Sequence, residues 1–319
     1  MRQKGLYPLM IKIEHLVKNY GTTCAVDDIS FEVGEGEIVG LLGPNGAGKS
    51  TTMNILTGYL SSTSGKACIA GIDILSDPIG AKKLIGYLPE QPPLYLDMTV
   101  WEYLNFAFDL KCCKLDRRAH IDAICETVKI SDMYHKVIRT LSKGYRQRVG
   151  IAQALIGNPK VIIFDEPTVG LDPKQIIEIR NLIRSLGKSH TVILSTHILS
   201  EVEMICNKVI IIDQGEIKAA DTPENLTRGL RAAGRVSIEF KGDLDTVVQE
   251  LEAFAPVKKV IVEETQPGDW HRLLIRAEPG TDTREKAAAI IAAHGYATRH
   301  IYRHIPSLED VFVEMTRRD

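Results

Sequence analysis

The residues best suited to chemistry form one glycine-rich run near the N-terminus. Its members, which fit the phosphate-binding pattern G-x-x-x-x-G-K-S/T in full, are Gly43, Pro44, Asn45, Gly46, Ala47, Gly48, Lys49, Ser50 and Thr51. Glycines let the backbone wrap closely, so that successive N–H groups can point at phosphate oxygens. Lys49 can reach the β- and γ-phosphates of a nucleotide, and the Ser50 hydroxyl can join the shell of a Mg²⁺ ion. The run therefore predicts a site for nucleotide phosphates.

An acidic pair further along the chain complements this run. The apolar residues 161–164 predict a buried strand, and Asp165 and Glu166 follow directly at its carboxyl end. Asp165 can hold Mg²⁺, either directly or through water. Glu166 can polarise an attacking water molecule as a general base. Two acids after a strand are usually a solvated loop, but beside the phosphate-binding run we interpret them as functional.

The surrounding sequence predicts elements that bring these residues together. Apolar residues 38–42 precede the glycine-rich run and a helical pattern begins near Ser50, which is the strand–loop–helix context that the pattern requires. A helix at 176–186 and a strand at 191–194 follow the acidic pair. This alternation predicts an α/β domain with a mostly parallel sheet covered by helices. Expected additions are strands at 10–16 and 29–33, a helical insert at about 92–157, and a strand pair at 209–213 and 216–218.

The pattern changes after Thr222-Pro223. Residues 236–240, 257–262, 272–276 and 297–303 read as strands, and residues 244–254 and 284–294 read as helices. The order β-α-β-β-α-β predicts a small α+β, ferredoxin-like domain. Ser307 is expected to cap a short final helix. We therefore expect an N-terminal extension at 1–9, a nucleotide-binding domain at 10–226 and an accessory domain at 230–319.

Composition limits the classes of function. The 319 residues carry a net charge of −2, which gives no support for nucleic-acid binding. The six cysteines form no C-x-x-C pair, and we expect them to be reduced thiols of a cytosolic protein. No signal peptide is apparent, and no apolar run is long enough to span a bilayer. A role at a membrane therefore requires a separate membrane partner.

The segment Leu141-Ser142-Lys143-Gly144-Tyr145-Arg146-Gln147-Arg148 resembles the signature sequence of ABC ATPases, LSGGQ followed by Q-R. Other P-loop ATPases lack this segment. Two positions depart from the consensus, because Lys143 replaces a glycine and Tyr145 replaces the glutamine. Ser142 can still supply a hydroxyl, and Gly144 permits close approach of the backbone to a γ-phosphate. The departures affect the contacts that the glutamine side chain normally makes.

The resemblance covers about residues 10–220 and implies further roles. It implies an ATPase that uses ATP and Mg²⁺ and works as a homodimer, or beside a paired ATPase subunit, with ATP held between Lys49 of one subunit and Ser142 of the other. The remaining matches are Tyr20 (adenine stacking), Gln91 (the Q-loop glutamine, toward the metal), Asp172 (the D-loop) and His197 (the switch histidine). Together with Lys49 and Glu166, His197 completes the expected catalytic set.

The ending Ser307–Phe312 and the LSKGYRQR form of the signature look most like ATPase subunits of ABC-2-type exporters, of the gliding-motility-associated and multidrug type. This resemblance implies an integral membrane partner and a peripheral location on the cytoplasmic face of the cell membrane. One alternative is an importer ATPase whose C-terminal domain senses the transported ligand. Another is a soluble ABC protein acting in translation or DNA repair, although this chain shows neither two nucleotide halves nor long coiled coils.

Overall fold

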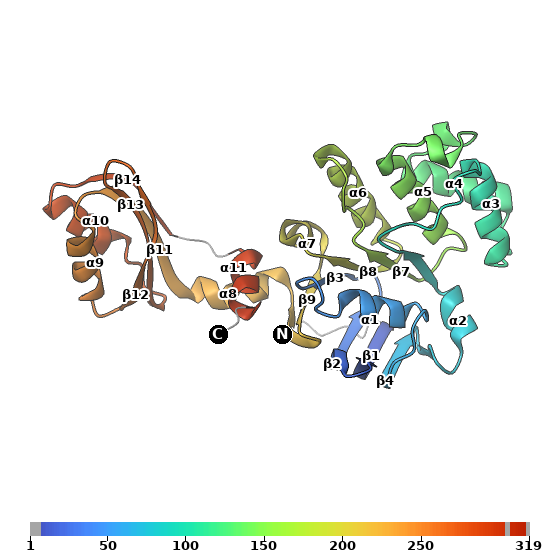
Figure 1. The fold of residues 1–319 in the computed structure, drawn as a ribbon, viewed down its shortest axis with the longest axis horizontal. Coiled ribbons are helices and arrows are strands. Elements are labelled where there is room, and N and C mark those ends of the chain that lie inside the picture. The colour runs from blue at the N-terminus through green and yellow to red at the C-terminus, as the bar shows by residue number, and fades with distance from the viewer. Residues whose placement is uncertain (1–7, 304–306, 317–319) are drawn as a thin grey trace. The chain divides into compact units, whose positions relative to one another are not determined.

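The computed structural model describes residues 8–303 and 307–316. The chain divides into two compact units, Met1–Pro223 and Glu224–Asp319, which we describe separately (Figure 1). Strand β1 (Leu9–Tyr20) starts one residue earlier than expected. Residues 1–7 of the expected N-terminal extension lie outside the described part of the chain.

The centre of the first unit is a six-stranded sheet in the order β10-β9-β3-β8-β7-β6. Five strands pair in parallel and β10 pairs antiparallel with β9. Strands β3, β7 and β8 are buried along their whole length, as expected for a parallel sheet covered on both faces. The strands are β3 (Ile38–Leu42), β6 (Ile85–Leu88), β7 (Val161–Asp165), β8 (Thr191–Thr196), β9 (Lys208–Asp213) and β10 (Glu216–Asp221). The α/β class predicted from the sequence is confirmed.

A second sheet of the first unit is antiparallel, in the order β2-β1-β4-β5. Its strands are β1, β2 (Thr23–Gly34), β4 (Ser64–Ile69) and β5 (Ile72–Asp73). Side chains from this sheet and from the central sheet share one apolar cluster, which includes Ile11, Ile13, Val39 and Leu41. The sequence pattern predicted β1 and β2 but none of β4, β5 and β6.

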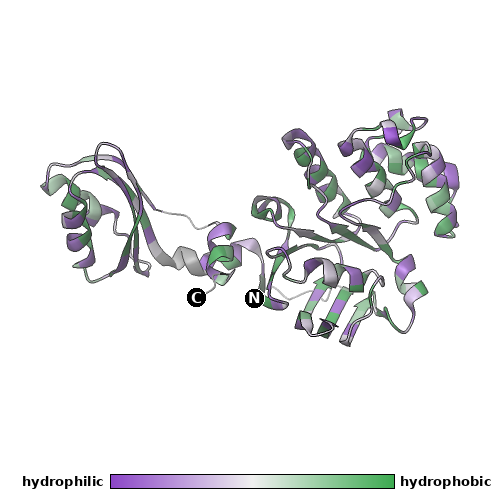
Figure 2. Cartoon of the chain, viewed as in Figure 1, coloured by the Kyte–Doolittle hydropathy of each residue, from purple (hydrophilic) through white to green (hydrophobic). Residues whose placement is uncertain are grey.

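Helices connect and cover these strands. Helix α6 is amphipathic: it buries Ile179, Leu182, Ile183 and Leu186 on one face, and most of its exposed residues are polar (Figure 2). The helices of this unit are α1 (Lys49–Leu56), α2 (Pro78–Lys83), α3 (Val100–Leu110), α4 (Arg117–Val128), α5 (Lys143–Leu155), α6 (Pro173–Leu186) and α7 (Leu199–Ile205), with 3₁₀ turns at Ser131–Met133 and Ile138–Thr140.

The helical insert contains α3, α4 and α5. Thr99 and Glu102 form the expected capping box at the start of α3. Beyond the other end of α3, Lys111 donates hydrogen bonds of 3.1 Å to the carbonyl oxygens of Ile85 and Ile156. Burial lowers the pKa of Lys111 to about 8. This lysine therefore ties the end of α3 to β6 and to the end of α5.

The second unit contains a four-stranded antiparallel sheet in the order β12-β13-β11-β14. Its core includes Val236, Ile238, Phe240, Leu273 and Ile275 from the strands, with Val247, Leu251 and Ile290 from the helices. The elements are α8 (Pro223–Ala232), β11 (Ala233–Lys241), α9 (Leu244–Glu252), β12 (Val257–Gln266), β13 (Trp270–Pro279), α10 (Arg284–Ala293), β14 (Ala297–Arg303) and α11 (Leu308–Thr316). From β11 to β14 their order is the predicted β-α-β-β-α-β.

Candidate active site

The order of strands in the central sheet explains why the predicted residues meet. Strand β8 lies between β3 and β7, with Leu42 beside Thr196 and Asp165 beside Ser195. All three strands run in parallel, so their carboxyl ends lie at one edge of the sheet. The glycine-rich loop, the acidic pair and His197 each begin where one of these strands ends. Ligands of open α/β sheets bind at this edge.

Two positions of the glycine-rich loop, Gly43 and Gly48, leave no room for a Cβ atom. A Cβ at Gly43 would lie 2.2 Å from the carbonyl oxygen of Ile212. At Gly48, φ is +106° and a Cβ would lie 2.5 Å from the carbonyl oxygen of Ala25. Glycine alone tolerates such an approach and readily adopts positive φ. Because Gly48 is the N-cap of α1, the loop leads directly into a helix N-terminus, which favours anions.

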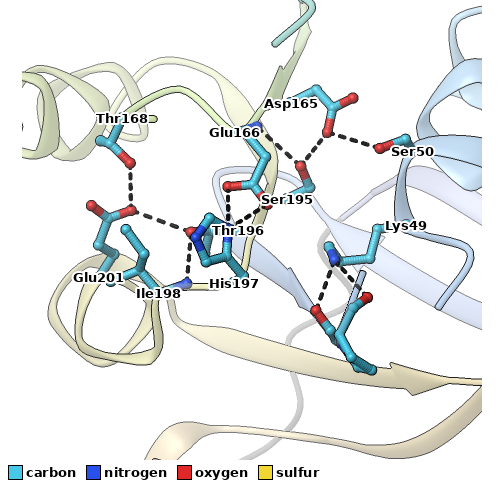
Figure 3. A network of polar contacts seen from close by, with 12 residues as sticks. Lys49, Ser50, Asp165, Glu166, Thr168, Ser195, Thr196, His197, Ile198 and Glu201 are labelled. Carbon is cyan, nitrogen blue, oxygen red and sulfur yellow. Dashed lines mark hydrogen bonds and ion pairs between the residues drawn. The ribbon is translucent and has the colours of Figure 1, made fainter. Parts of the chain in front are cut away.

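Lys49 is the first residue of α1 and is only 6% exposed. Its Nζ donates hydrogen bonds to the carbonyl oxygens of Gly43 at 2.7 Å and of Pro44 at 3.1 Å (Figure 3). Burial lowers the pKa of Lys49, while the charges of Glu166 and Asp165 act in the opposite direction. An ammonium group in such a place can exchange carbonyl oxygens for phosphate oxygens, which attract it more strongly.

Asp165 ends β7 and faces the start of α1. Its Oδ1 accepts a hydrogen bond from Ser195 Oγ and lies 3.5 Å from Ser50 Oγ (Figure 3). A carboxylate beside a hydroxyl gives hard oxygen donors, which Mg²⁺ prefers and usually completes with phosphate oxygens and water. Among the described residues no group of three or more His, Cys, Asp and Glu side chains could hold a metal by itself. The donor set thus fits a Mg²⁺ ion bound together with a nucleotide.

Glu166 and His197 form a pair beside this position. Both carboxylate oxygens of Glu166 lie 3.0 Å from His197 Nδ1. The backbone N–H of Glu166 donates to Ser195 Oγ at 3.1 Å, which fixes the start of the loop after β7. Glu166 has a left-handed backbone with φ of +47°. Residues other than glycine rarely adopt this conformation, and it is concentrated at functional sites.

Most of the side chains described above line a single cavity of about 440 Å³. It is large enough for a small ligand, and its lining is mainly polar. The residues that line it are Ala25, Asn45, Gly46, Gly48, Lys49, Ser50, Thr51, Glu90, Glu166, Val169 and His197. The predicted catalytic residues Lys49, Glu166 and His197 therefore share one cavity.

Gln91 and Tyr20 are among the predicted nucleotide contacts that do not line this cavity. Gln91 is exposed in the loop after β6 and lines a neighbouring cavity of about 500 Å³, whereas its neighbour Glu90 lines the cavity around Lys49. Tyr20 is 47% exposed at the end of β1, with Lys18 Nζ 5.3 Å from the centre of its ring. An exposed ring of this kind can stack on a base.

The signature and D-loop residues Ser142, Gly144 and Asp172 are also not among the residues that line the cavity. Ser142 caps α5 by accepting a hydrogen bond from the Tyr145 N–H at 3.4 Å. Asp172 caps α6 in the same way, through the Gln175 N–H at 2.9 Å. A Cβ at Gly144 would lie 2.6 Å from the Gln175 side chain, so the starts of α5 and α6 approach each other closely.

Sequence reasoning missed several residues of the site. Ser195 joins Asp165 to the Glu166 backbone, yet the sequence analysis used it only as part of the run before His197. Its place next to Thr196-His197 at a strand end was the signal that could have identified it. Ala25, Glu90 and Val169 line the cavity through tertiary contacts for which the sequence carries no evident signal.

Comparison with known proteins agrees with this geometry. Residues 26–169 match a family model described as "ABC transporter". The uncharacterized ABC transporter ATP-binding protein YxlF of Bacillus subtilis (strain 168) is 43% identical over 65% of this chain and 69% of that protein. Linearmycin resistance ATP-binding protein LnrL, from the same strain, is 32% identical over 97% of this chain and 99% of its own. Bacitracin transport ATP-binding protein BcrA of Bacillus licheniformis is 33% identical over 96% and 97%.

Solved structures show the same fold for the first unit. CbiO1 from Clostridium perfringens, part of the ABC transporter complex cbiONQ, matches with a TM-score of 0.63 and 29% identity over 70% of this chain and 95% of that one. The dimeric bacterial ABC transporter cassette MJ0796 matches with a TM-score of 0.61 and 28% identity over 67% and 98%. The expected P-loop ATPase fold is confirmed, and the chain belongs to the ABC transporter ATP-binding proteins as a subunit that hydrolyses ATP to power transport.

Proposed function

We propose that this chain drives an ABC-2-type exporter. Support comes from LnrL and BcrA, whose names refer to linearmycin resistance and bacitracin transport. Both match this chain over nearly its whole length, so the likeness includes the second unit. The importer alternative has no comparable support among these full-length relatives. Among the described residues, no helix has the length and apolar character needed to cross a bilayer. From the likeness to LnrL and BcrA we propose that the chain works at the cytoplasmic face of the cell membrane, bound to a separate integral membrane subunit.

The observation that carries the proposed mechanism of ATP hydrolysis is the convergence of Lys49, Glu166 and His197 on one cavity at the edge of the sheet. In the proposed reaction Lys49 holds the β- and γ-phosphates of ATP. Ser50 and Asp165 would hold Mg²⁺, which supplies charge neutralisation at the phosphates. Glu166 accepts a proton from the attacking water as general base. His197 lies against both oxygens of that carboxylate and holds it in place.

We further propose that two ATPase subunits close on ATP. Ser142 and Asp172 cap helices outside the residues that line the cavity around Lys49, so they are available to a second subunit. MJ0796, which matches the first unit, is a dimer in its solved structure. ATP that binds the closed pair more tightly than the open pair shifts the equilibrium toward closure, and hydrolysis reverses the shift. This cycle is the source of mechanical work on the membrane subunits.

The contact with the membrane subunit is proposed at the beginning of the helical insert. Gln91, Pro92, Pro93, Leu94 and Leu96 line the 500 Å³ cavity beside the start of α5. Tyr95 is 52% exposed, and its ring meets Phe106 edge to face. Exposed apolar groups gathered at one place mark interaction surfaces. Trp101 is not part of this surface, because it stacks on Tyr134 at 5.0 Å within the insert.

Crosslinking tests the proposed contact. In a variant freed of its native cysteines, cysteines at positions 94 and 95 are expected to crosslink to a cytoplasmic loop of the membrane subunit. Leu115→Cys is a matched control, because Leu115 is an exposed apolar residue of the same insert that does not line the 500 Å³ cavity. Mass spectrometry of the conjugates maps the partner residues. Crosslinks found only to the second unit of this chain would remove the proposed contact.

The second unit is proposed to regulate or stabilise the ATPase pair. Lys49, Gln91, Ser142, Glu166 and His197 all belong to the first unit. A chain that ends after Leu226 is therefore expected to bind ATP with nearly unchanged affinity while pairing or hydrolysing less well. Calorimetric titration with ATP measures the affinity, and circular dichroism shows whether the shortened protein is folded. Loss of ATP binding in a folded truncation would contradict the division into two domains.

A second calorimetric experiment, on the second unit, separates the exporter from the importer proposal. The importer alternative requires the second unit to bind the transported ligand. Calorimetry of the isolated unit Glu224–Asp319 with amino acids tests this requirement directly. Tight binding of an amino acid would favour the importer.

A further inference from the structure

A buried carboxylate lies behind the candidate active site. Glu201, on α7, is 1% exposed. Its Oε2 accepts hydrogen bonds from Thr168 Oγ1 at 2.8 Å and from Thr196 Oγ1 at 3.4 Å (Figure 3). Its Oε1 lies 3.4 Å from Arg180 Nη2 on α6, which provides a positive partner. Glu201 on α7 therefore joins the loop after β7, helix α6 and the end of β8.

Two of these segments carry the reacting side chains. Thr168 stands two residues after Glu166, and Thr196 stands directly before His197. Thr168 is 2% exposed and Thr196 is fully buried, so neither hydroxyl has ready access to solvent. Glu201 Oε2 thus accepts a hydrogen bond from one hydroxyl of each loop. These two bonds fix the distance between the loops close to the ends of β7 and β8.

The Thr196 hydroxyl extends this tie into the backbone around His197. It accepts a hydrogen bond from the Ile198 N–H at 3.0 Å and donates to Glu201. The residue between Thr196 and Ile198 is His197, so its backbone is held on both sides. His197 and Glu166 then meet at 3.0 Å on the other side of the same two loops.

We infer that Glu201 is a positioning residue for ATP hydrolysis, which holds Glu166 and His197 in register through the hydroxyls of Thr168 and Thr196. The inference rests on the proposed roles of Glu166 and His197. A buried charge is costly and is not needed to pack α7 against the sheet, where an apolar residue of similar volume would serve. Its geometric effect is specific, because hydrolysis requires the carboxylate and its water to be placed within a fraction of an ångström.

Two substitutions of Thr168 separate positioning from packing. Thr168→Val keeps the shape and removes the hydroxyl, whereas Thr168→Ser keeps the hydroxyl and removes a methyl group. In steady-state hydrolysis by the full-length chain, Thr168→Val is expected to lower kcat by about 10- to 100-fold, the scale of a modest misplacement of reacting groups. The KM for ATP should stay nearly unchanged, because Lys49 and the glycine-rich loop are untouched. Thr168→Ser should retain most of the kcat.

Thr191→Val is the matched control. Thr191 is 1% exposed and begins strand β8, at the end opposite to Thr196. Its hydroxyl accepts a hydrogen bond from the Gly36 N–H at 3.0 Å. Its removal should lower the melting temperature without changing kcat. Glu201→Gln provides a second variant, since its amide oxygen can still accept both hydroxyls and should preserve more activity than Glu201→Leu. ATP titrations and melting curves verify that each variant is folded.

Two results would overturn the inference. One is a kcat ranking in which Thr168→Val is tolerated and Thr168→Ser is not, because packing alone predicts that order. The other is an equal loss of kcat in Thr168→Val and Thr191→Val, which would indicate a general effect of removing buried hydroxyls. Glu166→Gln, assayed in parallel, tests the underlying roles. If it turns over ATP normally, the proposed site is wrong whatever the threonine variants show.

Discussion

Glu166→Gln is expected to bind ATP and to lose nearly all turnover. The amide keeps the shape of the side chain but cannot accept the proton of the attacking water. A positioned general base contributes about 10²- to 10⁴-fold to rate, so a loss of that size in kcat is expected. ATP that is bound but not hydrolysed should keep the subunits paired. Size-exclusion chromatography with ATP and Mg²⁺ should then show a stable dimer.

The control for this variant is Glu126→Gln, which neutralises an exposed carboxylate of the insert. It should leave both hydrolysis and elution volume unchanged. Turnover by Glu166→Gln close to that of the unmodified protein would remove Glu166 from its proposed role. The contact between Glu166 and His197 would then have a structural role only.

Lys49→Ala should act earlier in the cycle, at ATP binding. The substitution removes the buried ammonium group that stands at the glycine-rich loop. Hydrogen bonds to charged groups contribute about 1.5–3 kcal/mol, and each 1.4 kcal/mol is about tenfold in affinity. A weakening of the ATP dissociation constant by about 10- to 100-fold is therefore expected in a calorimetric titration.

Lys66→Ala is a suitable control, because the Lys66 side chain is 55% exposed and its nearest acid, Asp73, is 3.7 Å away. It should not alter ATP affinity. Lys49→Ala with undiminished affinity would contradict the placement of the β- and γ-phosphates at this loop. Loss of hydrolysis without loss of ATP affinity would not support this placement of the phosphates, since many changes at the site slow turnover.

Local sequence predicted the strands that carry the site, because each is a short apolar run followed by polar residues. Their order in the sheet was not predicted, and it is this order that places β8 between β3 and β7. Helix α7 was also missed. It spans seven residues and has no side-chain cap at Ile198, so the usual start signal is absent. The network around Glu201 consequently had no sequence support.

Other differences arise from tertiary packing. Strand β6 has four residues, too few for periodicity to be diagnostic, and it forms because β7 offers a paired edge. Tyr95 and Trp101, two aromatic residues that follow Gln91 within ten positions, lie in different environments in the structure. Tyr95 remains exposed, whereas Trp101 stacks on Tyr134, with the Arg118 guanidinium 4.7 Å from the centre of its ring. No spacing rule distinguishes these two aromatic residues.

The left-handed backbone of Glu166 has a consequence for engineering this protein. A residue with a Cβ incurs about 1–2 kcal/mol in that conformation, which glycine avoids. In a library randomised at position 166, selection for heat resistance alone would enrich glycine and discard the carboxylate. Thermostability and activity are in direct competition at this single position, as happens where function depends on an unfavourable conformation. Directed evolution of the chain therefore requires a turnover screen in every round.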